Sequence, residues 1–239
     1  MKKHTSVLLM ALALTAPTAG FAAIQEVVQI PENVFIPDGF DSNDHTEMVL
    51  YGHFPNTCFH AGAATATFSD GKILVKNSAY METEGNCIKM IVPWMTTVSA
   101  GVLPAGNFPV VFQKSGTELM NFGNFPVATS ISQSIDDHLY AYVNSAMIRN
   151  DSTGTPSVTL SGSFGISCMY IKEVRLERNK ADVVTVLPIV DLDQTKPCAV
   201  MFAPIPFEST FKLDSPLKTP ATLFHIRSMN GQSVNRVVE

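Results

Sequence analysis

Leu50-Tyr-Gly-His-Phe-Pro-Asn-Thr-Cys58 returns 110 residues later as Leu160-Ser-Gly-Ser-Phe-Gly-Ile-Ser-Cys168. The two stretches share Leu, Gly, Phe and Cys at the same spacing. After one added residue the match continues, because Cys87-Ile-Lys-Met-Ile-Val-Pro93 aligns with Cys198-Ala-Val-Met-Phe-Ala-Pro204. A repeat of this length indicates two copies of one structural module.

The repeat also predicts how the cysteines pair. Four cysteines allow three sets of two disulfides. If each copy carries its own pair, the bridges are Cys58–Cys87 and Cys168–Cys198, which close loops of nearly equal length. On the chain-entropy model each bridge would stabilise its module of about 100 residues by roughly 3 to 4 kcal/mol.

Residues 1–22 have the features of a cleavable secretory signal peptide. Two lysines precede an apolar run from Val7 to Leu14, and Pro17 and small residues follow up to Ala22. The run is too short to span a bilayer, and no later stretch is long enough. We expect a mature chain without a transmembrane segment, located in the periplasm or secreted, where oxidising conditions favour disulfides.

The composition is that of a folded, mildly acidic protein. The chain is 46% hydrophobic and 15% charged, with a formal net charge of −5. Loss of Lys2 and Lys3 with the signal would leave 14 basic against 21 acidic residues, a net charge of −7. An acidic surface disfavours nucleic acid and anionic lipid as partners.

A period of two residues runs through most of the chain and predicts strands. The alternating or β-branched segments are separated by Gly, Asn, Asp and Pro, and no window of 12 or more residues is typical of a capped amphipathic helix. Short strands at this spacing, with one disulfide per unit, predict an all-β chain of two tandem antiparallel β-sandwich domains. The segments are 64–68, 72–75, 157–161, 170–176 and 182–186.

The chain resembles the immunoglobulin-like modules of secreted bacterial proteins. The two cysteine pairs carry this resemblance, together with Leu103-Pro-Ala-Gly-Asn-Phe-Pro-Val110, which is similar to the turn and strand near the end of such modules. The resemblance covers both halves and implies a fold, not a specific family. In true immunoglobulin domains a Trp lies between the cysteines, whereas Trp94 follows Cys87 and the second copy has none. The resemblance therefore does not imply their inter-sheet disulfide geometry.

The domain boundaries follow from the repeat and from breaks in the strand pattern. We expect a signal peptide at 1–22, a first module at 23–123 and a second at 124–239. The join falls near Asn121–Pro126, where two Asn, a Gly and a Pro interrupt the pattern.

Two segments of the second module are expected to form turns. Arg149–Pro156 reads as an exposed loop or hairpin, and Ser228–Val238 as a hairpin around Asn230-Gly231.

The most polar cluster of the first module is a candidate binding loop, and it contains Asp38, Asp41, Asn43, Asp44 and His45. Its carboxylates are ligands that a hard cation such as calcium prefers. The loop lacks EF-hand spacing and a distal Glu, and Asp and Asn are also the residues that turns require. We therefore expect a contact loop and no metal.

Imidazoles are the weaker metal candidates. His53 and His60 flank Cys58, and imidazole together with methionine can bind copper. The second copy has Ser163 and Tyr170 at the matching positions, so the duplication does not preserve such a site.

The remaining candidate residues are expected mainly to belong to the protein core. Met90 and Met201 lie among alternating apolar residues and are expected to be buried. His225 and Arg227 are expected on opposite faces of one strand, with one of them directed inward or into a cleft between the modules.

No nucleophile elbow, zinc-protease motif, phosphate-binding loop or Cys-x-x-Cys pair occurs. We therefore expect a non-catalytic binding or structural protein of the bacterial cell envelope, without a cofactor. It would present loops, above all Asp38–His45 and Arg149–Pro156, or edge strands to a protein or another envelope component. The alternatives are a periplasmic metal-binding protein and a secreted hydrolase or protease inhibitor.

Overall fold

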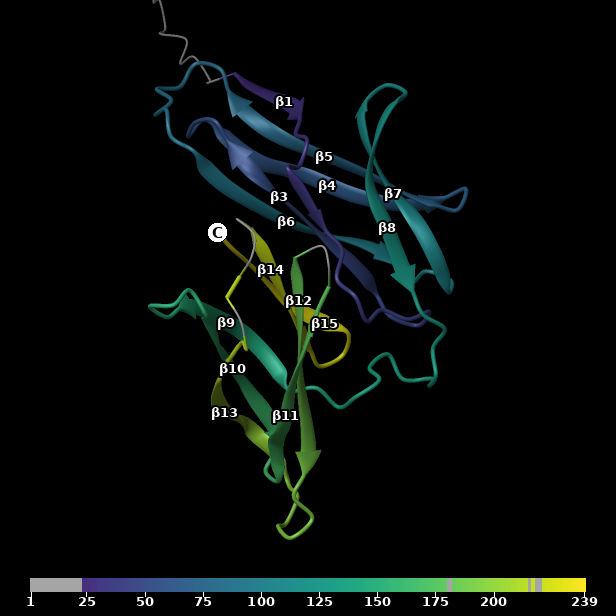
Figure 1. Cartoon of the computed structure of the whole chain (residues 1–239), viewed down its shortest axis with the longest axis vertical. Helices are drawn as coiled ribbons and strands as arrows, with labels where there is room; N and C mark the ends of the chain where they lie inside the picture. Colours follow the sequence, from purple (N-terminus) through teal and green to yellow (C-terminus); the bar gives the residue numbers. More distant parts are fainter. Residues whose placement is uncertain (1–22, 180–181, 215, 218–220) are drawn as a thin grey trace, which may run out of the picture.

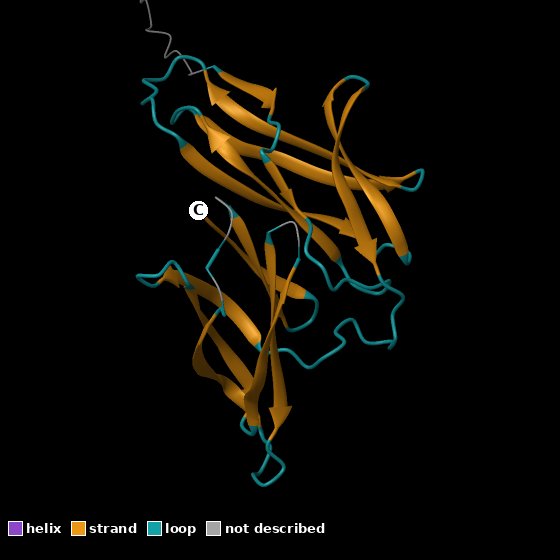
Figure 2. Cartoon of the chain, viewed as in Figure 1, coloured by secondary structure: helices purple, strands orange, loops and turns teal. Residues whose placement is uncertain are grey.

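The prediction of an all-β chain is confirmed. The structure is a computed structural model that describes residues 23–179, 182–214, 216–217 and 221–239, so the expected signal peptide lies outside the described residues. The described residues form fifteen strands and no helix (Figures 1 and 2). Among them no helix is long and apolar enough to cross a membrane.

Eight strands form two sheets in the first half of the chain. One sheet has the order β1-β5-β7-β8 with β4 on the other edge of β5, and the other has the order β2-β3-β6. Both sheets contribute side chains to one core, including Leu50 and Trp94 from the smaller sheet and Phe112 and Phe125 from the larger. The strands are β1 Ile24–Val28, β2 Asn33–Phe35, β3 Thr46–Phe54, β4 Phe59–Ser69, β5 Lys72–Glu82, β6 Val92–Gly101, β7 Gly106–Ser115 and β8 Glu118–Val127.

Seven strands form two further sheets in the second half, in the orders β13-β10-β9 and β11-β12-β14-β15. They enclose a second core, in which Leu160 and Phe164 of β10 pack with Phe224 and Ile226 of β14. The strands are β9 Tyr142–Asn150, β10 Pro156–Ile166, β11 Met169–Arg178, β12 Val183–Leu192, β13 Val200–Lys212, β14 Thr222–Ser228 and β15 Gln232–Val238.

The two halves pair their strands in the same way. In the first half, one edge of β5 pairs with β4. The other edge of β5 pairs first with β7, in parallel, and then with β1, antiparallel. In the second half, one edge of β12 pairs with β11. The other edge of β12 pairs first with β14, in parallel, and then with the segment around Tyr140, which bridges to Ile189. Both halves thus contain one parallel pair at the corresponding place.

The repeated glycines have a packing reason. Gly52 lies opposite Trp94 in the β3–β6 pair, and Phe54 stacks on the same indole with ring centroids 5.7 Å apart. Gly162 likewise lies opposite Phe207 in the β10–β13 pair, and Phe164 stacks on that ring at 4.6 Å. A glycine leaves room for the aromatic ring across the strand pair.

The boundary between the halves differs from the expected one. Asn121–Pro126 lies inside β8, and Phe125 is fully buried in the first core. The connection runs instead through residues 129–139, which contain no strand. Asn, Gly and Pro are tolerated in β8 because it is an edge strand, where fewer backbone groups need a partner.

The predicted disulfides and turns are confirmed. Cys58 bonds to Cys87 and Cys168 to Cys198. A tight turn joins β9 to β10 after Asn150, and Asn230 and Gly231 join β14 to β15 with φ angles of 63° and 68°. Such positive φ values at two central residues are typical of a hairpin turn that contains Asn-Gly.

Candidate functional site

The two halves meet across a small apolar contact. Phe35, Val49 and Tyr51 of the sheet β2-β3-β6 pack against Val183 of β12 and Leu223 of β14. All five residues are at most 5% exposed. The ends of β12 and β14 point toward the first half in Figure 1. The halves therefore share a buried interface in addition to their own cores.

The predicted binding loop lies beside this interface and is largely built into it. Asp41 and Asp44 are buried, and their carboxylates accept hydrogen bonds from the backbone N–H groups of Asn43 and Asp41, each at 3.0 Å. The Asn43 amide donates to the carbonyls of Ser132 and Ser134 at 3.0 and 2.8 Å. Asp41 and Asp44 therefore fix the shape of the loop, and Asn43 holds it against the connecting segment.

Only part of the loop is available for contacts. His45 is exposed, and Asp38 is half-buried at a cavity of about 110 Å³ between the halves. Asp137 of the connecting segment and Arg175 of the second half also line this cavity. Burial, together with the nearby carboxylates, raises the pKa of Asp137. A binding role for the loop remains a prediction.

Arg227 connects the loop to the second half. Its guanidinium donates to Asp44 Oδ1 at 2.8 Å and lies 5.2 Å from the ring centroid of Phe40 and 5.7 Å from that of Tyr140. Burial is the largest single influence and opposes the charged form, but the hydrogen bond to Asp44 and the attraction of the surrounding acidic groups together raise the pKa of Arg227. A buried charge of this kind needs its partner to be tolerated.

His225 lies on the same face as Arg227, which corrects the expectation of opposite faces. Residues two apart on a strand point to the same side. The imidazole is fully buried, its Nδ1 is 2.9 Å from Asn235 Oδ1, and its ring centroid is 5.6 Å from that of Phe40. Burial lowers the pKa of His225. Sequence reasoning did not identify Asn235 or Glu47, whose Oε1 accepts from Asn235 Nδ2 at 2.8 Å.

The two weaker metal candidates pair with carboxylates. His53 Nδ1 is 3.0 Å from Glu32 and its Nε2 is 2.9 Å from Glu239, while His60 Nε2 is 3.3 Å from Glu82. The structure does not bring His53 and His60 into a shared site. In the described part of the chain, no three His, Cys, Asp or Glu side chains are placed to hold a metal ion.

A second surface is apolar and follows the second cysteine of each pair. Ile91 is 72% exposed, and Phe202, which matches it in the repeat, is completely exposed. Val200 is 86% exposed beside Phe202. Met90 is 52% exposed and Met201 is half-buried, so the prediction that both are core is wrong. Apolar residues alternate along the start of β13 as in a buried strand, but β13 is an edge strand of its sheet.

Each apolar surface is fixed by its disulfide and by a matched pair of hydrogen bonds. In the first half, Thr57 N donates to Ile88 O at 3.2 Å, and Ile88 N donates to Thr57 Oγ1 at 3.0 Å. In the second half, Ser167 and Ala199 form the same two bonds, both at 3.0 Å. A hydroxyl residue directly before the first cysteine therefore holds the residue directly after the second.

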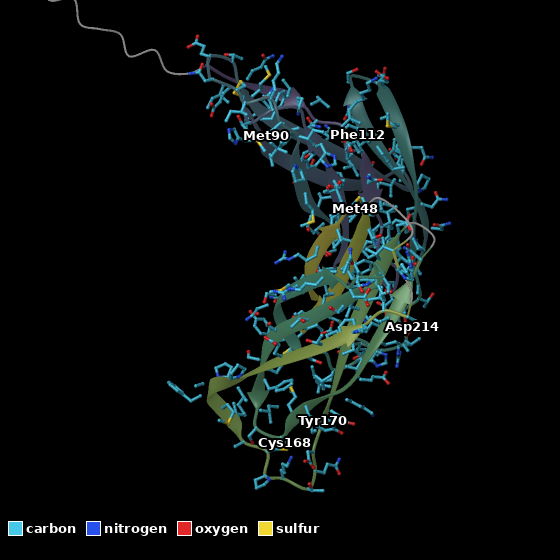
Figure 3. All side chains as sticks on the ribbon, turned by 60° about the vertical axis from the view of Figure 1, so that its left-hand side comes forward. Met48, Met90, Phe112, Cys168, Tyr170 and Asp214 are labelled. Atoms are coloured by element: carbon cyan, nitrogen blue, oxygen red, sulfur yellow. A yellow bond between two sulfur atoms is a disulfide. The ribbon has the colours of Figure 1, made fainter. Side chains whose placement is uncertain are left out.

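These two surfaces lie far apart. Figure 3 places Met90 near one end of the molecule and Cys168 and Tyr170 near the other. We call Val200–Ile205, at the start of β13, the β13 strip. Near the second disulfide Asp193 forms an ion pair with Lys196 at 2.8 Å, and hydrogen bonds from Lys196 and Thr195 lower its pKa to about 2.

The alignment of Cys87–Pro93 with Cys198–Pro204 was the signal for these surfaces, because it pairs Ile91 with Phe202. It does not show that both side chains face solvent. No protein-family model, curated protein or solved structure matches this chain significantly. The argument for function therefore depends on the described geometry alone.

Proposed function

We propose that this chain is an exported, non-catalytic binding protein of a bacterial cell envelope. It consists of two related immunoglobulin-like β-sandwich modules, and it contacts a protein or another envelope component mainly through the β13 strip. The two disulfides are typical of an oxidising compartment. The lysines and the short apolar run at the start of the chain favour export by a cleaved signal peptide.

The observation that carries the proposal is the exposure of Phe202. A phenylalanine with its whole surface in water, next to Val200 at 86% exposure, contributes nothing to the core. Transfer of a Phe side chain from water into an apolar contact is worth about 1.5 to 3 kcal/mol. Aromatic residues in a rigid setting are also the usual anchors of protein interfaces.

The free edge of β13 limits how a partner can bind this surface. Among the described residues the strand pairs only with β10, which leaves its other edge open, but Pro204 and Pro206 interrupt the backbone donors there. Prolines on an edge strand disfavour the addition of another strand. The partner therefore meets the side chains of the β13 strip, not its backbone.

Three further features support related modules. The parallel strand pair occurs at the same place in both sheets, and the glycine opposite an aromatic ring recurs in both halves. The hydrogen bonds that fix Ile88 and Ala199 to their neighbours correspond as well. Duplication explains these features together.

The experiment is capture of partners by chemical crosslinking to the tagged mature protein in its native envelope. Phe202→Ser removes the proposed anchor, and Ile131→Ser is the matched control, because Ile131 is 89% exposed in the connecting segment. Both variants must show the wild-type circular dichroism spectrum and unfolding midpoint. We expect F202S to lose a partner that wild type and I131S both retain. Capture of the same partner by F202S would overturn the proposal.

A further inference from the structure

We infer that the buried contact between the two halves is an acid-sensitive latch, which His225 holds closed at neutral pH and releases when the imidazole takes a second proton. The opening separates the two halves while each keeps its own core. The inference is independent of the partner that the β13 strip binds.

The hydrogen bonds around His225 determine which of its nitrogens carries the proton. Asn235 Nδ2 donates to Glu47 Oε1 at 2.8 Å and to Thr97 Oγ1 at 3.2 Å, so the amide oxygen of Asn235 is left as an acceptor. His225 Nδ1 therefore donates to it, at 2.9 Å. In the neutral ring the second nitrogen, Nε2, is then a bare acceptor.

His225 Nε2 is buried and has no hydrogen-bond partner within the part of the chain that the structure describes. A proton on it would create a buried N–H donor without an acceptor, on a ring that now carries a charge. Both changes are costly away from water. Separation of the halves exposes the ring to water and removes both costs.

The charged groups around His225 come from three elements. Glu47 on β3 lies 3.4 Å from Nδ1 and favours the imidazolium, as does Asp44 in the loop, whereas Arg227 on β14 opposes it. Asp44 is already paired with Arg227 at 2.8 Å. Burial is the largest influence and outweighs the others, so the pKa of His225 is lowered in the closed state.

The direction of the pH dependence follows from proton linkage. An exposed imidazole has a pKa of about 6.5, so below that pH the open state binds more protons than the closed state. Closure is therefore fully favoured above about pH 6.5 and weakens as the pH falls toward the lowered pKa. One extra proton makes the opening constant rise by at most about tenfold per pH unit.

His53 at another part of the contact acts in the opposite sense. It bridges β3 to the chain end, because its two nitrogens meet Glu32 and Glu239. The hydrogen bond that its imidazole donates to Glu32 raises the pKa of His53, so its contribution to closure is present in acid and is lost as the pH rises through that raised value. It is partly exposed, and water screens its contribution. His53→Gln should therefore weaken closure in acid by a constant amount and leave the slope of closure below about pH 6.5 unchanged.

Opening can be measured by the reaction of a buried thiol. Val49→Cys places a cysteine in the contact between the halves, and Val110→Cys places one in the first core; both valines are fully buried. The four native cysteines do not compete, because all are in disulfides. A dipyridyl disulfide, which labels thiols in acid as well as at neutral pH, reports how often each site opens.

We expect V49C to be labelled faster as the pH falls from about 7 to about 5, while V110C stays protected over this range. His225→Asn keeps a donor for Asn235 but cannot titrate, so it should abolish the rise in V49C labelling as the pH falls. His60→Gln is the matched control, since His60 is exposed and away from the contact; it should leave that dependence unchanged. If H225N does not fold, Glu47→Gln provides the test, because loss of this carboxylate should extend the rise in labelling to lower pH.

Two results would overturn the inference. Labelling of V49C could stay equally slow between about pH 7 and pH 5, which would mean that protonation does not open the contact. Labelling of V49C and V110C could instead rise together, which would mean that acid unfolds the first half and does not separate the halves.

Discussion

Substitution of Gly162 by alanine tests the packing that underlies the repeat. A Cβ at this position would lie 2.0 Å from the carbonyl oxygen of Tyr142 and 2.8 Å from two ring atoms of Phe207. The first contact is with backbone of the neighbouring strand β9, so no side-chain rotation relieves it. Either β9 or β10 must shift, at a place where the pairing register is already irregular.

The magnitude can be estimated from two opposing effects. Overpacking of a core costs about 1 to 3 kcal/mol, and the upper end applies because backbone must move. Replacement of glycine also reduces the flexibility of the unfolded chain, which stabilises the folded state by about 0.4 to 1 kcal/mol. We therefore expect Gly162→Ala to lower the free energy of unfolding by about 2 kcal/mol, or the urea midpoint by about 1 M.

The same strand contains the control. A Cβ at Gly165 would meet nothing within 4 Å, and this residue is not among those with positive φ, so Gly165→Ala should leave the midpoint equal or slightly higher. Gly52→Ala, with contacts of 3.1 to 3.3 Å, should fall between the two. Urea unfolding followed by circular dichroism measures all three. Equal midpoints for G162A and G165A would refute the reasoning.

Two further predictions concern the interface and the disulfides. Asp44→Asn removes the carboxylate 2.8 Å from the buried guanidinium of Arg227, leaves it the more distant Asp136 at 3.6 Å, and should destabilise the protein by about 3 kcal/mol. Lys172→Ala breaks an exposed pair and should leave the urea midpoint unchanged. An equal midpoint for D44N and K172A would contradict this. Serine at both Cys168 and Cys198 should lower the free energy of unfolding by about 3 to 4 kcal/mol; a midpoint within error of wild type would show that the bridge contributes little.

The repeat was the strongest source of correct prediction. It identified the cysteine pairing, and the period of two identified the all-β class, because both depend on local spacing. The glycine–aromatic pairs were not predicted from it. Phe207 faces Gly162, although by the repeat alignment Ile205 is the residue that matches Trp94, so a shift of two residues hides the correspondence.

The errors came from residues whose surroundings depend on distant parts of the chain. Asp41 and Asp44 are polar turn formers, but both are buried in the fold, and Asp44 pairs with Arg227 of the second half. Met90 has the pattern of a core strand residue, but no sheet covers it. Asn121–Pro126 has the composition of a linker and lies in an edge strand, which tolerates such residues.

The most direct test of the proposed function is site-specific photocrosslinking in the intact cell envelope. A photoreactive phenylalanine analogue at position 202 keeps the ring of Phe202 and reacts only with what touches it; the same analogue at position 131 is the control. The account predicts one defined partner adduct from position 202 and no such adduct from position 131. Absence of any adduct at position 202, or identical adducts at both positions, would contradict it.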